Sequence, residues 1–182
     1  MALRIDERYE VGAPVAAAWD LLVDPRRVVA CVPGGALDAV VDARTYDGHV
    51  RVRLAGITFA YRGRVRLAEV DVPGRRVRIV GEARARLGDG TARLSLESWL
   101  VPRPGGRTEV VAEASVNVGG ALVALGRGFL EALGHEVFRL FAARVRAALE
   151  GEVPPADEPL RALPLLAGAA RAWLSGDGGT RR

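Results

Sequence analysis

Few side chains of this 182-residue chain could take part in covalent or metal chemistry. It has one cysteine, Cys31, and two histidines, His49 and His135. A zinc site needs three or four Cys, His or carboxylate ligands at close spacing, and a reactive thiol needs a base or a cation beside it. Neither pattern surrounds these residues, so the sequence predicts no catalytic residue, no metal and no cofactor. We interpret Cys31 as an inert, half-buried thiol.

The charged residues point to a sheet with one wet face. All 26 basic residues are arginines, and the formal net charge is only +4. Arginine alternates with apolar residues over residues 50–54, 61–67 and 76–79, which is typical of antiparallel strands with one dry face. We interpret the arginine face as a solvated surface; docking to anionic lipid or to an acidic protein is the alternative. No aromatic residues alternate with these arginines to stack on bases, so no nucleic-acid partner is predicted.

Turn residues divide most of the chain into seven predicted strands. These are residues 3–11, 37–44, 46–55, 57–70, 75–86, 91–101 and 107–118. Two short helices are predicted after the first strand, with Pro14 in the first turn of the first helix and Pro25 ending that helix. Apolar residues recur at helical spacing from Leu122 to Leu149. The sequence therefore predicts an α+β fold, in which a seven-stranded curved antiparallel sheet wraps around a long C-terminal helix.

Several short motifs within residues 3–150 resemble a known family. They are Ala13-Pro14 with Trp19-Asp20-Leu21-Leu22-Val23-Asp24-Pro25, Ala30-Cys31-Val32-Pro33-Gly34, Gly63-Arg64-Val65-Arg66-Leu67 with Asp71-Val72-Pro73, and Val118-Gly119-Gly120 before Leu122 and Gly126. With the order of elements, they resemble the START-like helix-grip (SRPBCC) superfamily, and within it the branch of the CoxG subunit of carbon monoxide dehydrogenase. One departure is the short Leu87-Gly88-Asp89-Gly90, where the family has a longer glycine-rich stretch.

The resemblance implies a function as well as a fold. Members of this branch bind a membrane quinone and present it to a molybdenum hydroxylase of the carbon monoxide dehydrogenase type. It therefore implies a non-enzymatic carrier whose cargo is an isoprenoid quinone, such as menaquinone or ubiquinone. Two alternatives stay open: a cyclase or dehydratase of polyketides, and an assembly or maturation partner of the dehydrogenase. An enzyme would need inward-facing acids or bases, and the predicted inner face offers little beyond Tyr61, Ser98 and Cys31.

Small residues on the predicted inner face, including Gly63, Gly81 and Ala83, either draw the helix close or leave a void. The resemblance implies a deep apolar cavity between the sheet and the long helix, so we expect the void there, with its entrance beside residues 31–35. The predicted ligand-binding residues are Cys31, Val32, Pro33, Gly34, Val52, Leu54, Phe59, Tyr61, Ile79, Leu94, Leu96, Ala112, Ala114, Leu122, Leu125, Phe129 and Leu133.

The sequence after the long helix predicts a separate region. We divide the chain into a ligand-binding domain, residues 1–150, and a Pro-rich linker with a tail helix, residues 151–182. The tail is expected either to pack as an ordinary helix or to lie at a lipid interface. The predicted membrane contacts are Arg161, Leu163, Leu166, Arg171, Trp173 and Leu174. No apolar run is long enough to span a bilayer, and the first residues include acids, so we expect a cytoplasmic protein, peripheral at the inner face of the membrane.

Overall fold

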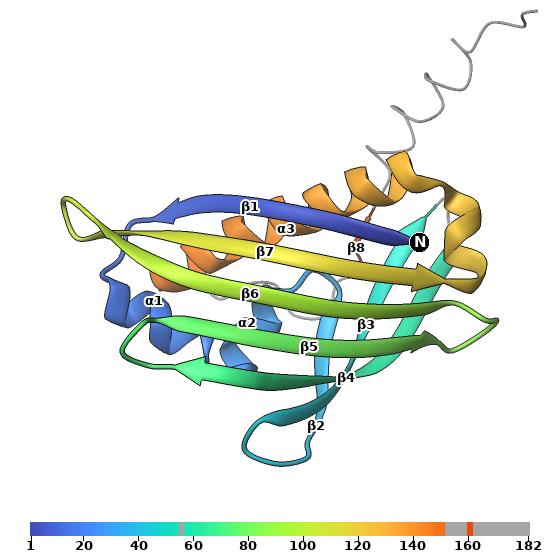
Figure 1. Cartoon of the computed structure of the whole chain (residues 1–182), viewed down its shortest axis with the longest axis horizontal. Helices are drawn as coiled ribbons and strands as arrows, with labels where there is room; N and C mark the ends of the chain where they lie inside the picture. The colour runs from blue at the N-terminus through green and yellow to red at the C-terminus, as the bar shows by residue number, and fades with distance from the viewer. Residues whose placement is uncertain (55–56, 152–159, 162–182) are drawn as a thin grey trace, which may run out of the picture.

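The computed structural model describes residues 1–54, 57–151 and 160–161 (Figure 1). Its elements are β1 (Ala2–Val11), α1 (Val15–Leu22), α2 (Pro25–Cys31), β2 (Gly35–Val40), β3 (Thr45–Leu54), β4 (Ile57–Asp71), β5 (Arg76–Ala85), β6 (Thr91–Arg103), β7 (Arg107–Gly119), the 3₁₀ helix η1 (Gly120–Leu125), α3 (Arg127–Leu149) and β8 (Leu160–Arg161). The two short helices, the seven long strands and the long helix of the prediction are all present. The predicted fold class is confirmed.

The strands form one sheet in the order β1-β7-β6-β5-β4-β3-β2, and all of these neighbours are antiparallel. β8 was not predicted. It pairs in parallel with β3, joining Val52 to Leu160 and Arg53 to Arg161. This part of β3 has a free edge, because β2 begins at Gly35, opposite Val50. A strand of two residues carries no alternation that could reveal it in the sequence.

The long helix covers only part of the inner face of the sheet. α3 packs mainly along β1 and lies behind the β1 and β7 half of the sheet (Figure 1). Ala142 and Val145 of α3 share a buried cluster with Tyr9 and Val11 of β1. On the other half, Val65 of β4 also faces inward, yet its side chain is 40% exposed. The inner face is therefore dry under α3 and open over β3, β4 and β5.

Capping and packing hold the two short helices in place. Pro25 occupies the first turn of α2, and Asp24 Oδ1 accepts hydrogen bonds from the backbone N–H groups of Arg26 at 2.9 Å and Arg27 at 3.3 Å. This satisfies two amide groups that a helix start leaves unpaired. Trp19 anchors α1 in the core, with the Arg75 guanidinium 5.6 Å from its ring centroid. α2 is thereby fixed where it can form a wall of a cavity.

The long helix begins later than the sequence predicts. Gly126, at φ 81°, interrupts the helical conformation before α3, and Gly120, at φ 64°, is the first residue of η1. Leu122 and Leu125 therefore lie in η1 and not in the long helix, which is a correction to the predicted start at Leu122. Glycine adopts positive φ without steric cost, so it ends the regular periodicity here. Within the described ranges, no helix has the length and apolarity needed to cross a membrane.

Candidate functional site

An apolar cavity of about 240 Å³ lies on the open part of the inner face. The strands β2 to β6 form one wall, and α2 with the segment that follows it forms the other. Its lining residues are Val29, Val32, Gly35, Ala36, Gly48, His49, Val50, Tyr61, Gly63, Val65, Gly81, Glu82, Ala83, Ala92 and Leu94. α3 is described in full, and none of its residues is among them, so the predicted position of the cavity between the long helix and the sheet is wrong. The long helix packs along β1 instead and leaves this part of the inner face uncovered.

The cavity exists because the strand register brings small residues into one row. Gly48 pairs with Gly63, Gly63 with Ala83, and Ala83 with Ala92. The neighbouring row on the side of the hairpin between β3 and β4 contains Val50 and Tyr61. The neighbouring row on the other side contains Val65, Gly81 and Leu94. Larger side chains therefore surround a strip with almost no side-chain volume. Such a strip leaves space unless a neighbouring element fills it.

The segment after α2 holds the opposite wall close to the sheet. The Gly35 N–H donates to the Val32 carbonyl at 3.0 Å, and the Arg51 N–H donates to the Gly34 carbonyl at 2.9 Å. Gly34 has φ 72°, and a Cβ on Gly35 would lie 2.9 Å from the Val32 Cβ. Glycine is therefore required at both positions. Val32 is held at the cavity wall by backbone geometry.

Tyr61 places a phenol at the cavity wall. Burial raises its pKa above the usual value for tyrosine, so its hydroxyl stays neutral well above neutral pH. Gly90 lies directly against this ring, since a Cβ there would be 2.8 Å from the Tyr61 hydroxyl oxygen. A neutral phenol can donate one hydrogen bond to a carbonyl oxygen, but it is a poor general base.

The predicted ligand-binding residues fall into groups in the structure. Val32, Tyr61 and Leu94 line the cavity. Cys31, Pro33 and Gly34 are buried beside it. A third group lies further along the inner face, in η1 or on α3, and does not line it; its members are Val52, Phe59, Ile79, Leu96, Ala112, Ala114, Leu122, Leu125, Phe129 and Leu133.

Some predicted residues lie at or beyond the limits of what the structure describes. Only the backbone is described for Leu54, which ends β3, and for Arg161 of β8. The other predicted membrane contacts lie outside the described residues; they are Leu163, Leu166, Arg171, Trp173 and Leu174.

Sequence reasoning missed several lining residues. Val29 and Ala36 flank the Pro-Gly segment, and Gly48, Val50 and Ala92 belong to the central rows. Val50 and Ala92 have inward parity in their strands, which is a usable signal. Which small residues stand side by side depends on the register between strands, and the alternation within a single strand does not reveal that register where bulges shift it.

Cys31 is completely buried, and its Sγ donates weakly to the Arg27 carbonyl at 3.6 Å. Burial raises the pKa of the thiol, while the charges of Arg144 and Arg27 oppose that shift. The thiolate is the reactive form of cysteine. The geometry therefore leaves Cys31 a packing residue in the main core cluster.

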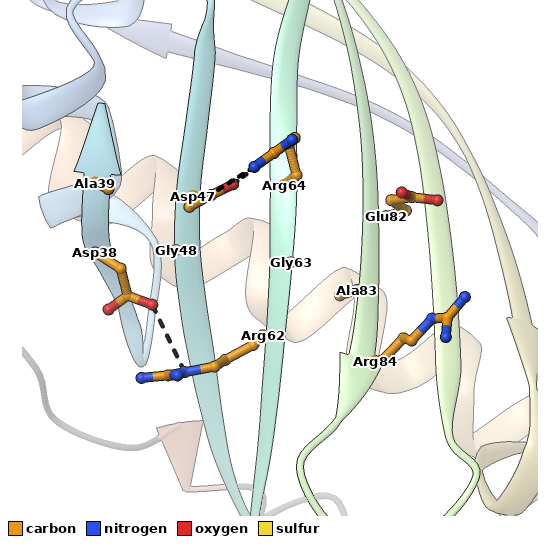
Figure 2. Close-up of a pocket in the computed structure, with 10 residues that line it drawn as sticks. All are labelled: Asp38, Ala39, Asp47, Gly48, Arg62, Gly63, Arg64, Glu82, Ala83 and Arg84. Carbon is orange, nitrogen blue, oxygen red and sulfur yellow. Dashed lines mark hydrogen bonds and ion pairs between the residues drawn. The ribbon is translucent and has the colours of Figure 1, made fainter. Parts of the chain in front are cut away.

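A second hollow, of about 490 Å³, lies over the outer face of β3, β4 and β5 and is lined by charged residues (Figure 2). Its acids are largely neutralised. The Arg64 Nε lies 2.7 Å from Asp47 Oδ1, and the Arg62 Nε lies 3.8 Å from Asp38 Oδ2. The hydrogen bond from Arg64 lowers the pKa of Asp47 and keeps that carboxylate charged. This hollow is a solvated, ion-paired surface with no net charge from these four side chains.

The same pairing continues across the outer face. Arg4 pairs with Asp6 within β1, and cross-strand pairs join Arg76 to Glu97, Arg78 to Glu69 and Arg103 to Glu109. Exposed ion pairs of this kind contribute little to stability, about 0–1 kcal/mol each. They support the interpretation of the arginine face as a solvated surface. The apolar cavity is therefore the better candidate for a binding site.

The family of the CoxG subunit of carbon monoxide dehydrogenase matches residues 8–149. A conserved protein from Geobacillus kaustophilus is similar in structure, with a TM-score of 0.75 and 18% identity, over 82% of this chain and 96% of that one. A START superfamily protein from Mycobacterium smegmatis has a TM-score of 0.57 and 13% identity, over 81% and 97%. At these identities the likeness shows the helix-grip fold alone. No curated protein matches the sequence.

Proposed function

Because the chain belongs to the CoxG family of carbon monoxide dehydrogenase, we propose that it is a non-enzymatic carrier of a hydrophobic small molecule, and that its cargo is an isoprenoid quinone such as menaquinone or ubiquinone. The observation that carries this proposal is the apolar cavity between α2 and the strands β2 to β6. An apolar cavity gains free energy when it takes apolar surface out of water.

The size and lining of the cavity support a quinone head group in particular. Pockets that enclose a whole drug-sized ligand have volumes of about 300–1,000 Å³. This cavity, at about 240 Å³, is smaller, so it matches one ring system with the rest of the ligand outside. The phenol of Tyr61 supplies a hydrogen-bond donor for a carbonyl oxygen of the ring. The isoprenoid chain would then follow the open inner face outside the cavity.

The partner in this proposal is a molybdenum hydroxylase of the carbon monoxide dehydrogenase type, and the family name points to that enzyme. The carrier takes quinone from the inner face of the membrane, and residues 151–182 act as a separate region that contacts lipid. The dehydrogenase would reduce the bound quinone, so the carrier itself needs no catalytic residue.

Ligand binding by the purified, delipidated protein tests the proposal. Decyl-ubiquinone and menaquinone in detergent should bind at one molecule per chain, as native mass spectrometry would record. Decanol is the matched control, because it offers an apolar chain without the ring. Absence of quinone binding would overturn the proposal, and equal binding of decanol would remove its preference for quinones. Chemical turnover of an added polyketide by the purified protein would favour the cyclase alternative.

A further inference from the structure

One end of the molecule carries apolar side chains that no other described element covers. Leu87, in the turn between β5 and β6, is 92% exposed, and Phe59 near the start of β4 is 37% exposed. Val123 and Leu125 of η1 are exposed to a similar degree as Phe59. The turn and η1 lie together at the right-hand end of Figure 1. We call this set of four residues the Leu87 end.

Hydrogen bonds fix the parts of the Leu87 end to one another. The Ala121 N–H of η1 donates to Asp89 Oδ1 of the turn at 3.1 Å, and the Arg86 N–H donates to the Ala60 carbonyl of β4 at 2.9 Å. Phe59 and Leu87 line one hollow of about 260 Å³ together. The four apolar side chains therefore come from three segments that hydrogen bonds hold together, and their exposure does not depend on the position of a single loop.

The charge around these residues is positive. Arg84 and Arg86 precede Leu87, and Arg53 of β3 lies opposite Thr58, next to Phe59. Like Arg8, Arg66 and Arg93 elsewhere on the outer face, these three form no ion pair with any residue that the structure describes. The acids nearest in sequence are Glu82 of β5, on the same face as Arg84, and Asp89 of the turn, whose carboxylate accepts the Ala121 amide. Exposed apolar groups among unpaired arginines are the composition that binds an anionic lipid interface.

From this arrangement we infer that the Leu87 end is the surface by which the protein docks on an anionic lipid bilayer, with Leu87 inserted among the acyl chains. The inference deepens the proposed carrier function and rests on it for its purpose. Phe59 stands on the same face of β4 as the cavity residue Tyr61, two residues away. A quinone leaving the bilayer at the Leu87 end would meet an apolar path along the inner face to the cavity.

The return of the chain after α3 supports the same orientation. β8 pairs with Val52 and Arg53, and Val52 in turn pairs with Phe59. The backbone of Arg161, a predicted membrane contact and the last residue that the structure describes, therefore lies at the edge of the Leu87 end.

Vesicle co-sedimentation of the full chain tests the inference. Wild-type protein should bind vesicles of phosphatidylcholine with phosphatidylglycerol more tightly than vesicles of phosphatidylcholine alone. Leu87→Asp should weaken binding to the anionic vesicles about tenfold or more, because it removes an inserted side chain and adds a like charge. Arg86→Gln should weaken binding to the anionic vesicles about fivefold, since the attraction of one arginine to an acidic leaflet changes the affinity by about that factor.

Val72→Asp is the matched control. Val72 is 52% exposed in the turn between β4 and β5, at the opposite end of the molecule (Figure 1). It should leave vesicle binding unchanged, and thermal unfolding should show that all variants fold. Equal binding by Leu87→Asp and wild type, or equal losses in Leu87→Asp and Val72→Asp, would overturn the inference. The inference would also be overturned if the wild type did not bind vesicles and Leu87→Asp lost binding to the dehydrogenase, because the Leu87 end would then be a protein interface.

Quinone binding in detergent separates this inference from the proposed function. Leu87→Asp should bind decyl-ubiquinone in detergent as wild type does, because Leu87 does not line the cavity. If wild type binds anionic vesicles through Leu87 but takes up no quinone in detergent, the carrier function fails and the docking surface stands. If quinone binds and vesicle binding is indifferent to Leu87, the docking surface fails alone.

Discussion

Gly63 and Ala83 face each other across β4 and β5 so closely that a Cβ on Gly63 would lie 2.8 Å from the Ala83 Cβ and would overlap the Glu82 carbonyl oxygen. The backbone cannot accommodate a side chain there without moving one strand. Gly63→Ala should therefore lower the free energy of unfolding by about 1–3 kcal/mol, as overpacking does. Urea denaturation would measure it.

Gly81→Ala is the control for that change, because Gly81 lies on the same inner face. A Cβ there would meet Val65 Cγ2 at 3.4 Å, which is an ordinary contact. Its effect on the free energy of unfolding should stay within about 0.5 kcal/mol. Equal destabilisation by both substitutions would mean that the close approach at Gly63 is absent in solution.

A larger side chain at Gly81 should close the cavity. Gly81→Leu points its side chain between Val65 and Leu94, into the space where a quinone ring is proposed to bind. Quinone affinity in detergent should fall at least tenfold while the fold persists, and Gly81→Ala should bind nearly as wild type. Unchanged affinity in a folded Gly81→Leu variant would place the ligand elsewhere.

Cys31 should resist modification in the folded protein. Burial raises the pKa of the thiol, so little thiolate exists at pH 8, and the side chain is inaccessible. Ellman's reagent should react at least about a hundredfold more slowly with the native protein than with the urea-unfolded protein. Fast labelling without unfolding would show that the α2 segment opens.

Tyr9 should make the protein less stable at alkaline pH. Burial raises the pKa of Tyr9 above its ordinary value of 10.0, the Cys31 thiolate adds to the shift, and Arg146 opposes it. Because the folded state holds the Tyr9 proton more tightly than the unfolded state does, protonation of Tyr9 stabilises the fold. This stabilisation is complete below about pH 10 and is lost as the pH rises further. Tyr9→Phe should therefore show a smaller decline in unfolding free energy between pH 9 and 11.

At pH 7, Tyr9→Phe should be neutral or stabilising by up to about 1 kcal/mol, since the buried hydroxyl has no hydrogen-bond partner among the described residues. Tyr46→Phe is the control: it removes a hydroxyl that donates to the Ala43 carbonyl at 2.7 Å, and should cost about 1 kcal/mol. Parallel pH curves for Tyr9→Phe and wild type would contradict the role given to Tyr9.

Removal of residues 159–182 should separate lipid attachment from folding. Among the described residues, the truncation removes the two-residue pairing of β8 with β3, so the free energy of unfolding should fall by no more than about 1 kcal/mol. The side chains of the removed segment carry a net charge of +3, from Arg161, Arg171, Arg181 and Arg182 against Asp177. Binding to anionic vesicles should weaken, and the difference from full-length protein should shrink as salt rises.

The seven long strands were predictable because arginine and apolar residues alternate along them and glycine or proline marks most turns. The start of α3 was not, because Leu122 and Leu125 fit the helical spacing while Gly120 and Gly126 impose positive φ around them. Helical periodicity in the sequence does not distinguish a 3₁₀ turn from the first turn of a long helix.

The position of the cavity was less predictable than its presence. Ala112 is as small as Ala83 and also faces inward, but it is buried between Glu7 and Ser98 in the half of the sheet that α3 covers. Ala83 lies in the half that α3 leaves open. Which half the helix covers depends on packing along β1, and no local sequence pattern records that choice.

The ion pairs of the outer face affect how the protein approaches other molecules. An arginine 2.5–4 Å from a carboxylate forms a dipole whose field fades within about one Debye length, roughly 10 Å at 0.1 M salt. The high isoelectric point, about 10.1, therefore overstates the attraction exerted by most of the sheet. Arg53, Arg84 and Arg86 have no ion-pair partner among the described residues, so their charges are not offset in this way, and each attracts a negatively charged surface more strongly than a paired arginine does.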